Sequence, residues 1–134
     1  MDLYAQNIMD HYRHPRNVGQ LDQAAAWRRE ANYSCGDIVE VWLDVRNGVV
    51  RDLKYQPEGC AISQAAISIL SELIIGKTVA AVLAFTFYDL QQILGIVVSQ
   101  RRKKCAILGL LAVQNAILTQ QERPLRQWSD FYRE

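Results

Sequence analysis

The sequence is poor in cysteine, with three among its 134 residues. An odd number of thiols argues against a disulfide-stabilised secreted domain and favours a reducing compartment, so we expect a cytoplasmic protein. The longest apolar runs, Val79–Phe85 and Cys105–Val113, are far shorter than the roughly 20 residues that cross a bilayer. A net charge of +1 leaves no large excess of cations, so we expect neither nucleic acid nor membrane as a partner. The first residues show no basic segment followed by an apolar one, and we expect no signal peptide.

Apolar residues, by contrast, make up 50% of the chain, which suffices for a core without disulfides. The length and the lack of a linker predict a single domain over residues 1–134, with a polar tail at about 121–134. This tail carries Trp128, Phe131 and Tyr132, and the sequence leaves open whether these rings dock on the domain. We expect the protein to be a monomer.

The N-terminal residues predict a helix that begins after Asp2 and runs to about Arg13, because apolar residues recur there at helical spacing. His11 and His14 fall at the end of this helix. We expect both to be surface or capping residues, with His14 as a candidate to face a partner.

Three antiparallel strands are predicted next, at residues 25–33, 39–46 and 49–56. The alternation of apolar and polar side chains is clearest in the second of them. Asn47-Gly48 separates the last two strands and is typical of a tight hairpin turn, whose central residues both need a positive φ.

The second half of the chain predicts helices. After the third strand the apolar period lengthens to about 3.6, which indicates a helix ending near Gly76. A short helix is expected at 78–84, another capped by Asp89 and reaching Leu94, and a long one at 103–120 with one apolar face. The predicted fold class is therefore α+β: a three-stranded antiparallel sheet packed on one face by about five helices, in a two-layer sandwich.

Three cysteines and one aspartate are candidate metal ligands: Cys35, Asp37, Cys60 and Cys105. Cys35 and Asp37 lie in a predicted turn, while Cys60 and Cys105 fall near the N-termini of two different helices. Three thiolates and one carboxylate supply the four ligands of a tetrahedral zinc site, and the same set suits an iron–sulfur cluster. A carboxylate binds these metals less tightly than a thiolate, which suits a site that must be remodelled.

Each of these residues has a second interpretation. The wide gaps between the cysteines are unlike the short paired spacings of zinc fingers, and a free cysteine often packs as a small hydrophobe. Asp37 also fits a turn, where aspartate caps backbone N–H groups. The four cations at 101–104 oppose the dipole of the helix that follows. They either hold Cys105 as a thiolate, attract an anion, or form a solvated charge run or a weak nucleic-acid patch.

Five short motifs resemble the iron–sulfur cluster scaffold family of IscU, SufU and the N-terminal domain of NifU. The similarity is dispersed from about residue 4 to residue 119. The matching segments are Asp10–Gly19 (DHYRHPRNVG), Ser34–Asp37 (SCGD), Gly59–Ser63 (GCAIS), Gly76-Lys77, and Arg102–Leu108 (RKKCAIL). Each motif is short, and their shared order and separations make the combination specific.

The resemblance implies that Cys35, Asp37, Cys60 and Cys105 form one site. It implies zinc in the isolated protein and iron or a [2Fe–2S] cluster in function. Sulfur would come as persulfide from a cysteine desulfurase, a pyridoxal-phosphate enzyme, with Cys105 or Cys35 as the acceptor. Apo iron–sulfur proteins would receive the cluster. A protein of this kind is a scaffold or sulfur-transfer protein more than an enzyme.

The sequence also departs from the family pattern. Lys104 stands where IscU has a histidine before its third cysteine, as in SufU. Residues 95–100 lack the proline pair that an Hsp70-type chaperone reads in IscU, so a chaperone partner is doubtful. The gap between Cys60 and Cys105 is too short for the insertion usual in SufU, and Ala65 and Ala66 replace serines of the family.

Three functions fit these observations. The first is a scaffold for assembly and transfer of a [2Fe–2S] cluster. The second is a zinc-dependent sulfur acceptor of the SufU type, which activates the desulfurase without holding a cluster, and Lys104 favours it. The third is a non-catalytic interaction module with a structural zinc site.

Overall fold

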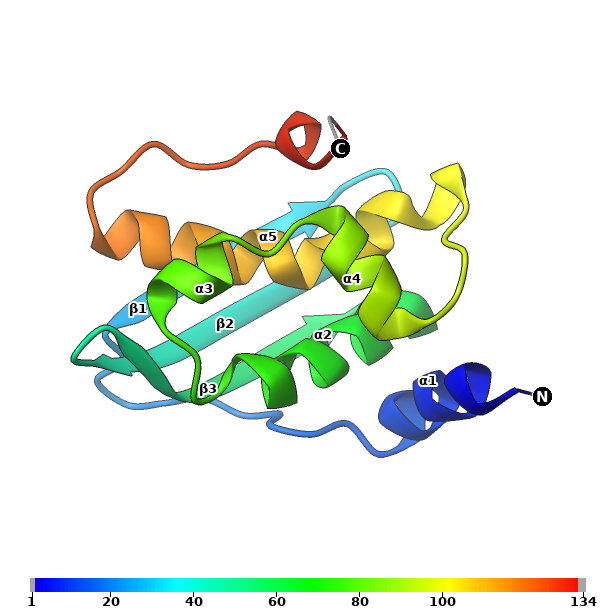
Figure 1. Ribbon diagram of the computed structural model, residues 1–134, viewed down its shortest axis with the longest axis horizontal. Helices are drawn as coiled ribbons and strands as arrows, with labels where there is room; N and C mark the ends of the chain where they lie inside the picture. The colour runs from blue at the N-terminus through cyan, green and yellow to red at the C-terminus, as the bar shows by residue number, and fades with distance from the viewer. Residues whose placement is uncertain (1, 133–134) are drawn as a thin grey trace.

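A computed structural model describes residues 2–132 and shows a three-stranded antiparallel sheet covered by helices on one face (Figure 1). The strands β1 (Ala26–Asn32), β2 (Asp37–Arg46) and β3 (Val49–Glu58) are adjacent in sequence order, so they form a meander. The predicted α+β class is confirmed. No helix within residues 2–132 is long and apolar enough to cross a bilayer.

The helices lie close to their predicted bounds. They are α1 (Leu3–Arg13), α2 (Ala61–Ile74), α3 (Val79–Leu83), α4 (Phe87–Leu94) and α5 (Lys103–Gln120), with 3-10 helices η1 (Gln100–Arg102) and η2 (Trp128–Phe131). The prediction that Asp89 caps α4 is wrong, because Thr86 occupies the N-cap. Asp89 completes a capping box instead, accepting from the Thr86 N–H at 2.9 Å, while the Thr86 hydroxyl accepts from the Asp89 N–H at 3.1 Å.

The sheet turns one face to the helices and the other outward. Val39, Val41 and Leu43 of β2 are buried beneath the helices, and the residues between them are partly exposed. The turn at Asn47-Gly48 has φ values of 54° and 72°, which confirms the predicted hairpin. The buried side of this sheet is the base on which α2 and α5 pack.

Helix α5 is enclosed on all sides. Every residue from Cys105 to Leu118 is buried, whereas the sequence predicted a single apolar face. The reason is its position: the sheet lies on one side, α2 beside it, and α3, α4 and the C-terminal segment cover the remainder (Figure 1). Gly109 allows α2 to come close, because a side chain there would overlap Ile67.

His11 is not at the surface, which corrects the prediction. It is 5% exposed, between α1 and α2, with Nδ1 2.7 Å from Ser68 Oγ and Nε2 3.5 Å from Glu72. The backbone N–H of Arg16 donates to the same Ser68 oxygen at 3.0 Å. Burial is the main cause that lowers the pKa of His11, so the ring is neutral at neutral pH. His14 is exposed and is the C-cap of α1, as predicted.

The C-terminal segment docks on the helices. It turns back after α5 and ends in η2, whose Phe131 is 2% exposed. This answers the question that the sequence left open for the aromatic tail. The last two residues of the predicted tail lie outside the described residues.

Candidate metal centre

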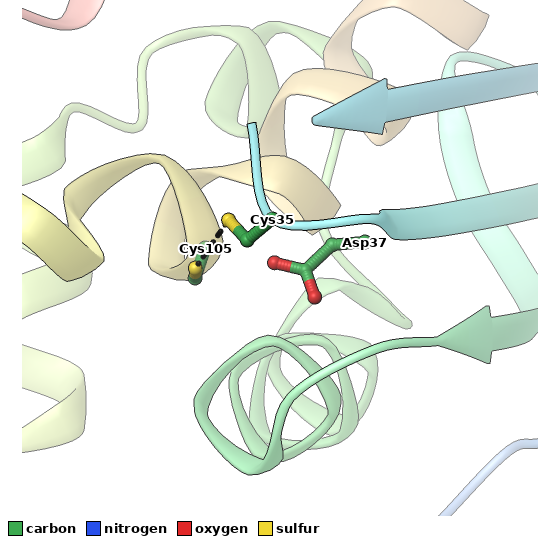
Figure 2. Close-up of side chains that lie close together, drawn as sticks. All are labelled: Cys35, Asp37 and Cys105. Atoms are coloured by element: carbon green, nitrogen blue, oxygen red, sulfur yellow. Dashed lines mark hydrogen bonds between the residues drawn. The ribbon is translucent and has the colours of Figure 1, made fainter. Parts of the chain in front are cut away.

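The four candidate ligands come from three separate segments that meet at one end of the sheet. Cys35 lies in the turn between β1 and β2, and Asp37 is the first residue of β2 (Figure 2). Cys60 is the N-cap residue of α2, and Cys105 lies in the first turn of α5. The prediction that Cys60 and Cys105 fall at helix N-termini is confirmed.

Three of these residues form a compact group. The ligand atoms of Cys35, Asp37 and Cys105 all lie within 4.8 Å of one another. The two sulfurs of this group are 3.4 Å apart, as the dashed line in Figure 2 marks. Cys60 is outside the group, but its Sγ is 3.9 Å from Asp37 Oδ2. The structure therefore brings all four residues together, with Cys60 joined to the others through Asp37.

This spacing suits a metal ion. Two thiolates bound tetrahedrally at a zinc–sulfur distance of about 2.3 Å lie about 3.8 Å apart. The observed Cys35–Cys105 separation of 3.4 Å is close to that value. A sulfur and a carboxylate oxygen on the same zinc are about 3.5 Å apart, and Cys60 and Asp37 are 3.9 Å apart. The spacing of Cys35, Asp37 and Cys105 thus fits zinc or iron, and the distance from Cys60 to Asp37 is compatible with a fourth ligand.

Asp37 is held in place by the backbone of the neighbouring segment. It is 0% exposed, and its Oδ1 accepts a hydrogen bond from the Cys60 N–H at 2.9 Å. Gly59 has a φ of 135°, and a side chain there would overlap the Asp37 carboxylate. One oxygen of Asp37 therefore caps a backbone N–H, while the other faces the Cys60 thiol. The capping interpretation of Asp37 is confirmed, while its role as a metal ligand stays a prediction.

Asn32 organises the Cys35 turn, and the sequence analysis missed it. Its Nδ2 donates to Cys35 Sγ at 2.8 Å, and its Oδ1 accepts from the Ser34 N–H at 3.3 Å. Its backbone carbonyl accepts from the Gly36 N–H at 3.0 Å. An asparagine three residues before the cysteine was the available signal, because asparagine side chains bond the backbone two residues ahead in turns. A donor on the sulfur stabilises a thiolate.

Cys105 is the most enclosed of the three thiols. It is buried, whereas Cys35 is exposed and Cys60 is half-buried. Burial is the main cause that raises the pKa of the Cys105 thiol, and its contacts with Asp37, Cys35 and Cys60 raise it further. The preceding cations do not hold this residue as a thiolate in the metal-free protein. A bound cation would take the place of the proton.

The four cations before Cys105 divide into two pairs. Arg101 and Arg102 line an open pocket of about 380 Å³ together with Ser34 and the three cysteines. Lys103 and Lys104 do not line it, because their ammonium groups lie over aromatic rings. Of the interpretations open for this run, an attraction for anions fits the arginines, which stand beside the thiols.

Comparisons with known proteins show a matching family and several similar proteins. The family described as NifU-like N terminal domain matches residues 3–127. The iron–sulfur cluster assembly scaffold protein IscU 1 of Archaeoglobus fulgidus is 31% identical over 116 residues, covering 87% of this chain and 75% of that protein. The zinc-dependent sulfurtransferase SufU of Bacillus subtilis is 31% identical over 132 residues, covering 86% of this chain and 89% of SufU. The crystal structure of a NifU-like protein from Brucella abortus shares the fold, with a TM-score of 0.75 at 24% identity over 91% of this chain and 96% of that one.

Proposed function

The chain belongs to the family of NifU-like N-terminal domains, and on this basis we propose that it is a scaffold on which a [2Fe–2S] cluster is assembled and from which it is transferred. Sulfur arrives as persulfide from a cysteine desulfurase, and apo iron–sulfur proteins receive the cluster. In this proposal residues 1–134 act as one monomeric domain in a reducing compartment such as the cytoplasm, because the three free thiols must remain reduced. A chaperone is not part of this proposal, because residues 95–100 lack a proline pair.

The meeting of the four ligands is the observation that carries the proposal. Cys35, Asp37 and Cys105 share one small volume, and Cys60 lies beside Asp37. A closed structural zinc site surrounds its metal with four protein ligands. Here one thiol is exposed, and an open pocket reaches all three sulfurs. This openness favours exchange of the bound species over a purely structural role.

Exposure favours Cys35 as the first sulfur acceptor. It is the exposed thiol, whereas Cys105 is 3% exposed. The Cys35 thiolate attacks the outer sulfur of the donor persulfide, the sulfur–sulfur bond breaks, and the donor cysteine leaves as a thiolate. The Asn32 amide stabilises the attacking sulfur, and the arginines at the pocket attract the anionic donor. Cys105 Sγ, 3.4 Å from Cys35, is placed to take part in the next exchange.

A second candidate function is that of a zinc-dependent sulfur acceptor, which stimulates the desulfurase and holds no cluster. The similarity to SufU over 86% of this chain supports it, and so does Lys104 in front of Cys105. In this case zinc stays bound by Asp37, Cys60 and Cys105, and the exposed Cys35 carries the sulfur alone.

Anaerobic reconstitution distinguishes the two candidates. The protein is incubated with ferrous iron, cysteine, a reductant and a cysteine desulfurase, and visible absorption is followed before and after addition of an apo ferredoxin. The scaffold function predicts a [2Fe–2S] spectrum that moves to the ferredoxin. The second function predicts retained zinc, no spectrum, and strong stimulation of desulfurase turnover. A colourless protein that leaves turnover unchanged contradicts both.

Two variants serve as controls for this experiment. Cys35→Ser is expected to remove sulfur acceptance in either case while the protein stays folded. Ser34→Ala is the comparison variant: it changes a neighbouring side chain of the same pocket without removing a thiol, and the turn keeps the hydrogen bond from the Ser34 N–H to Asn32. If Cys35→Ser unfolds the protein, the site is structural and the third function replaces both candidates.

A further inference from the structure

The C-terminal strap, defined here as residues 121–132, returns along α5 to the end of that helix that carries Cys105. In Figure 1 the strap leaves α5 at Gln120 and its terminal η2 lies over the region where α5 begins. Helix η2 packs against α5. The strap therefore runs from the C-terminal end of α5 back to the N-terminal end, where Cys105 of the candidate metal centre lies.

The middle of the strap is fixed by two buried amides of α5. Asn115 Oδ1 accepts from the Arg126 N–H at 2.8 Å, and Asn115 Nδ2 donates to the Arg126 carbonyl at 3.2 Å. Gln114 Oε1 accepts from Arg126 Nη1 at 2.6 Å. Buried amides of this kind are costly when unpaired, so they hold the strap at one position along the helix. Phe131, which is buried, fixes its other end.

Aromatic rings of the strap cover the two lysines that precede Cys105. Lys103 Nζ lies 4.6 Å from the centre of the Tyr132 ring and 4.5 Å from that of Phe87 in α4. Lys104 Nζ lies 5.7 Å from the centre of the Trp128 ring. These distances are within the range of cation–π attraction. Because the lysines begin α5, the rings hold the same helical turn that carries Cys105.

These contacts are local, because the strap does not pack closely along its whole length. A cavity of about 560 Å³ lies between the strap and the connection from α3 to α4, with Leu83 and Phe85 on one side and Leu125 on the other. The helix turn beneath the rings has no side-chain cap of its own, since Arg102 at the N-cap makes no such hydrogen bond.

From this arrangement we propose that Trp128 and Tyr132 are positioning residues for the metal centre. By holding Lys104 and Lys103, they keep the first turn of α5 folded and keep Cys105 at bonding distance from the other ligands. They also keep the two ammonium groups out of the thiol pocket. The role rests on the metal-binding part of the proposed function and not on sulfur transfer or cluster assembly.

The test compares leucine and phenylalanine variants of the two rings. Trp128→Leu with Tyr132→Leu removes the cation–π contacts and keeps apolar side chains, whereas Trp128→Phe with Tyr132→Phe keeps an aromatic face. The zinc-loaded proteins are mixed with a chromogenic chelator, and the rate of zinc release is recorded. We expect release from the leucine variant to be between about fivefold and thirtyfold faster, and release from the phenylalanine variant to stay close to that of the original protein.

Substitution of the two lysines completes a double-mutant cycle between the rings and the cations. In a Lys103→Met, Lys104→Met background, the leucine substitutions are expected to change zinc release by less than about twofold, because the cation is already absent. An equal acceleration in both backgrounds would show that the rings act by packing alone, and would overturn the proposal. So would an unchanged release rate in the leucine variant. If the leucine variant does not fold, the lysine substitutions in the intact strap give the same comparison.

Hydrogen exchange of the metal-free protein separates this proposal from the proposed function. Backbone amides of residues 103–106 are expected to exchange faster in the leucine variant, while amides in the middle of α5 keep their rates. Unchanged exchange at 103–106 contradicts the positioning role even if cluster assembly succeeds. Faster exchange supports that role even if reconstitution yields no cluster.

Discussion

Two groups of polar side chains both contact α2, and they differ in their chemistry. Between α1 and α2, His11 Nδ1 is 2.7 Å from Ser68 Oγ, Asn17 Nδ2 donates to Ser71 Oγ at 2.9 Å, and the Ser71 hydroxyl donates to a backbone carbonyl at 2.7 Å. At the N-terminal end of the same helix, three thiols lie close to the Asp37 carboxylate, which accepts from the Cys60 N–H. The first group consists of hydrogen bonds between side chains and backbone, and it stabilises the fold. The second consists of three thiols and a carboxylate, which can exchange the thiol protons for a bound cation, and this is the pattern of a binding site.

Gly59→Ala should produce the largest change, because it affects the second group through the backbone. The alanine backbone would have to keep a disfavoured φ, and its side chain would overlap the Asp37 carboxylate. We expect a loss of unfolding free energy of roughly 2–4 kcal/mol and at least a tenfold weaker affinity for zinc. Urea denaturation and zinc titration measure the two effects. Gly76→Ala is the matched control, since its φ of 95° carries a similar strain with no atom within 4 Å of the new side chain.

Ser68→Ala should damage the first group and leave the second intact. It removes the acceptor for the Arg16 N–H and the partner of His11 Nδ1. We expect the unfolding free energy to fall by about 2 kcal/mol, because two buried groups lose their hydrogen bond. Zinc affinity measured by competition with a chelator should not change. A parallel fall in zinc affinity would show that the two groups are coupled through α2.

Asp37→Asn should raise the unfolding free energy of the metal-free protein, whereas Gly59→Ala and Ser68→Ala should lower it. The asparagine oxygen can still accept from the Cys60 N–H, and the buried negative charge is gone. We expect the metal-free protein to gain about 1 kcal/mol of unfolding free energy and to bind zinc more weakly. Thermal unfolding with and without zinc measures both. A less stable metal-free variant would show that the carboxylate contributes to the fold as it stands.

The smallest of these effects should be the contribution of His11 to the pH dependence of the unfolding free energy. Its pKa is lowered, first by burial and then by Arg16. In the unfolded chain the histidine binds a proton near pH 6.5, while in the fold it stays neutral to lower pH. The unfolded state therefore binds more protons, and stability falls as pH drops below about 6.5 towards the folded pKa. Urea midpoints between pH 7.5 and 5.5 should decline less in His11→Gln than in the original protein.

The sequence predicted the elements well because local signals and the global fold agree here. Alternation in β2, the Asn47-Gly48 turn and the long apolar helix each specify a structure that the core also requires. One error came from tertiary context, because His11 looks like a surface residue until α2 supplies Ser68 as its partner. The other error was local, because Thr86, three residues before Asp89, is the N-cap of α4.

The site was predicted as a set of residues but not as a geometry. The motifs named Cys35, Asp37, Cys60 and Cys105, and the structure brings them together. Their contacts depend on side chains from other elements, such as the Asn32 amide on the Cys35 sulfur, which no spacing rule contains. The role of each residue as a ligand stays a prediction until a metal is bound and measured.

The enclosure of α5 has a mechanical consequence for the access to Cys105. A helix buried from Cys105 to Leu118 cannot slide or tilt without opening the core on several sides at once. The Cys105 sulfur is therefore nearly fixed in position, and only a change in the first turn of α5 can move it. A molecule that reacts with Cys105 must therefore enter the pocket, because this helix cannot carry the thiol outward.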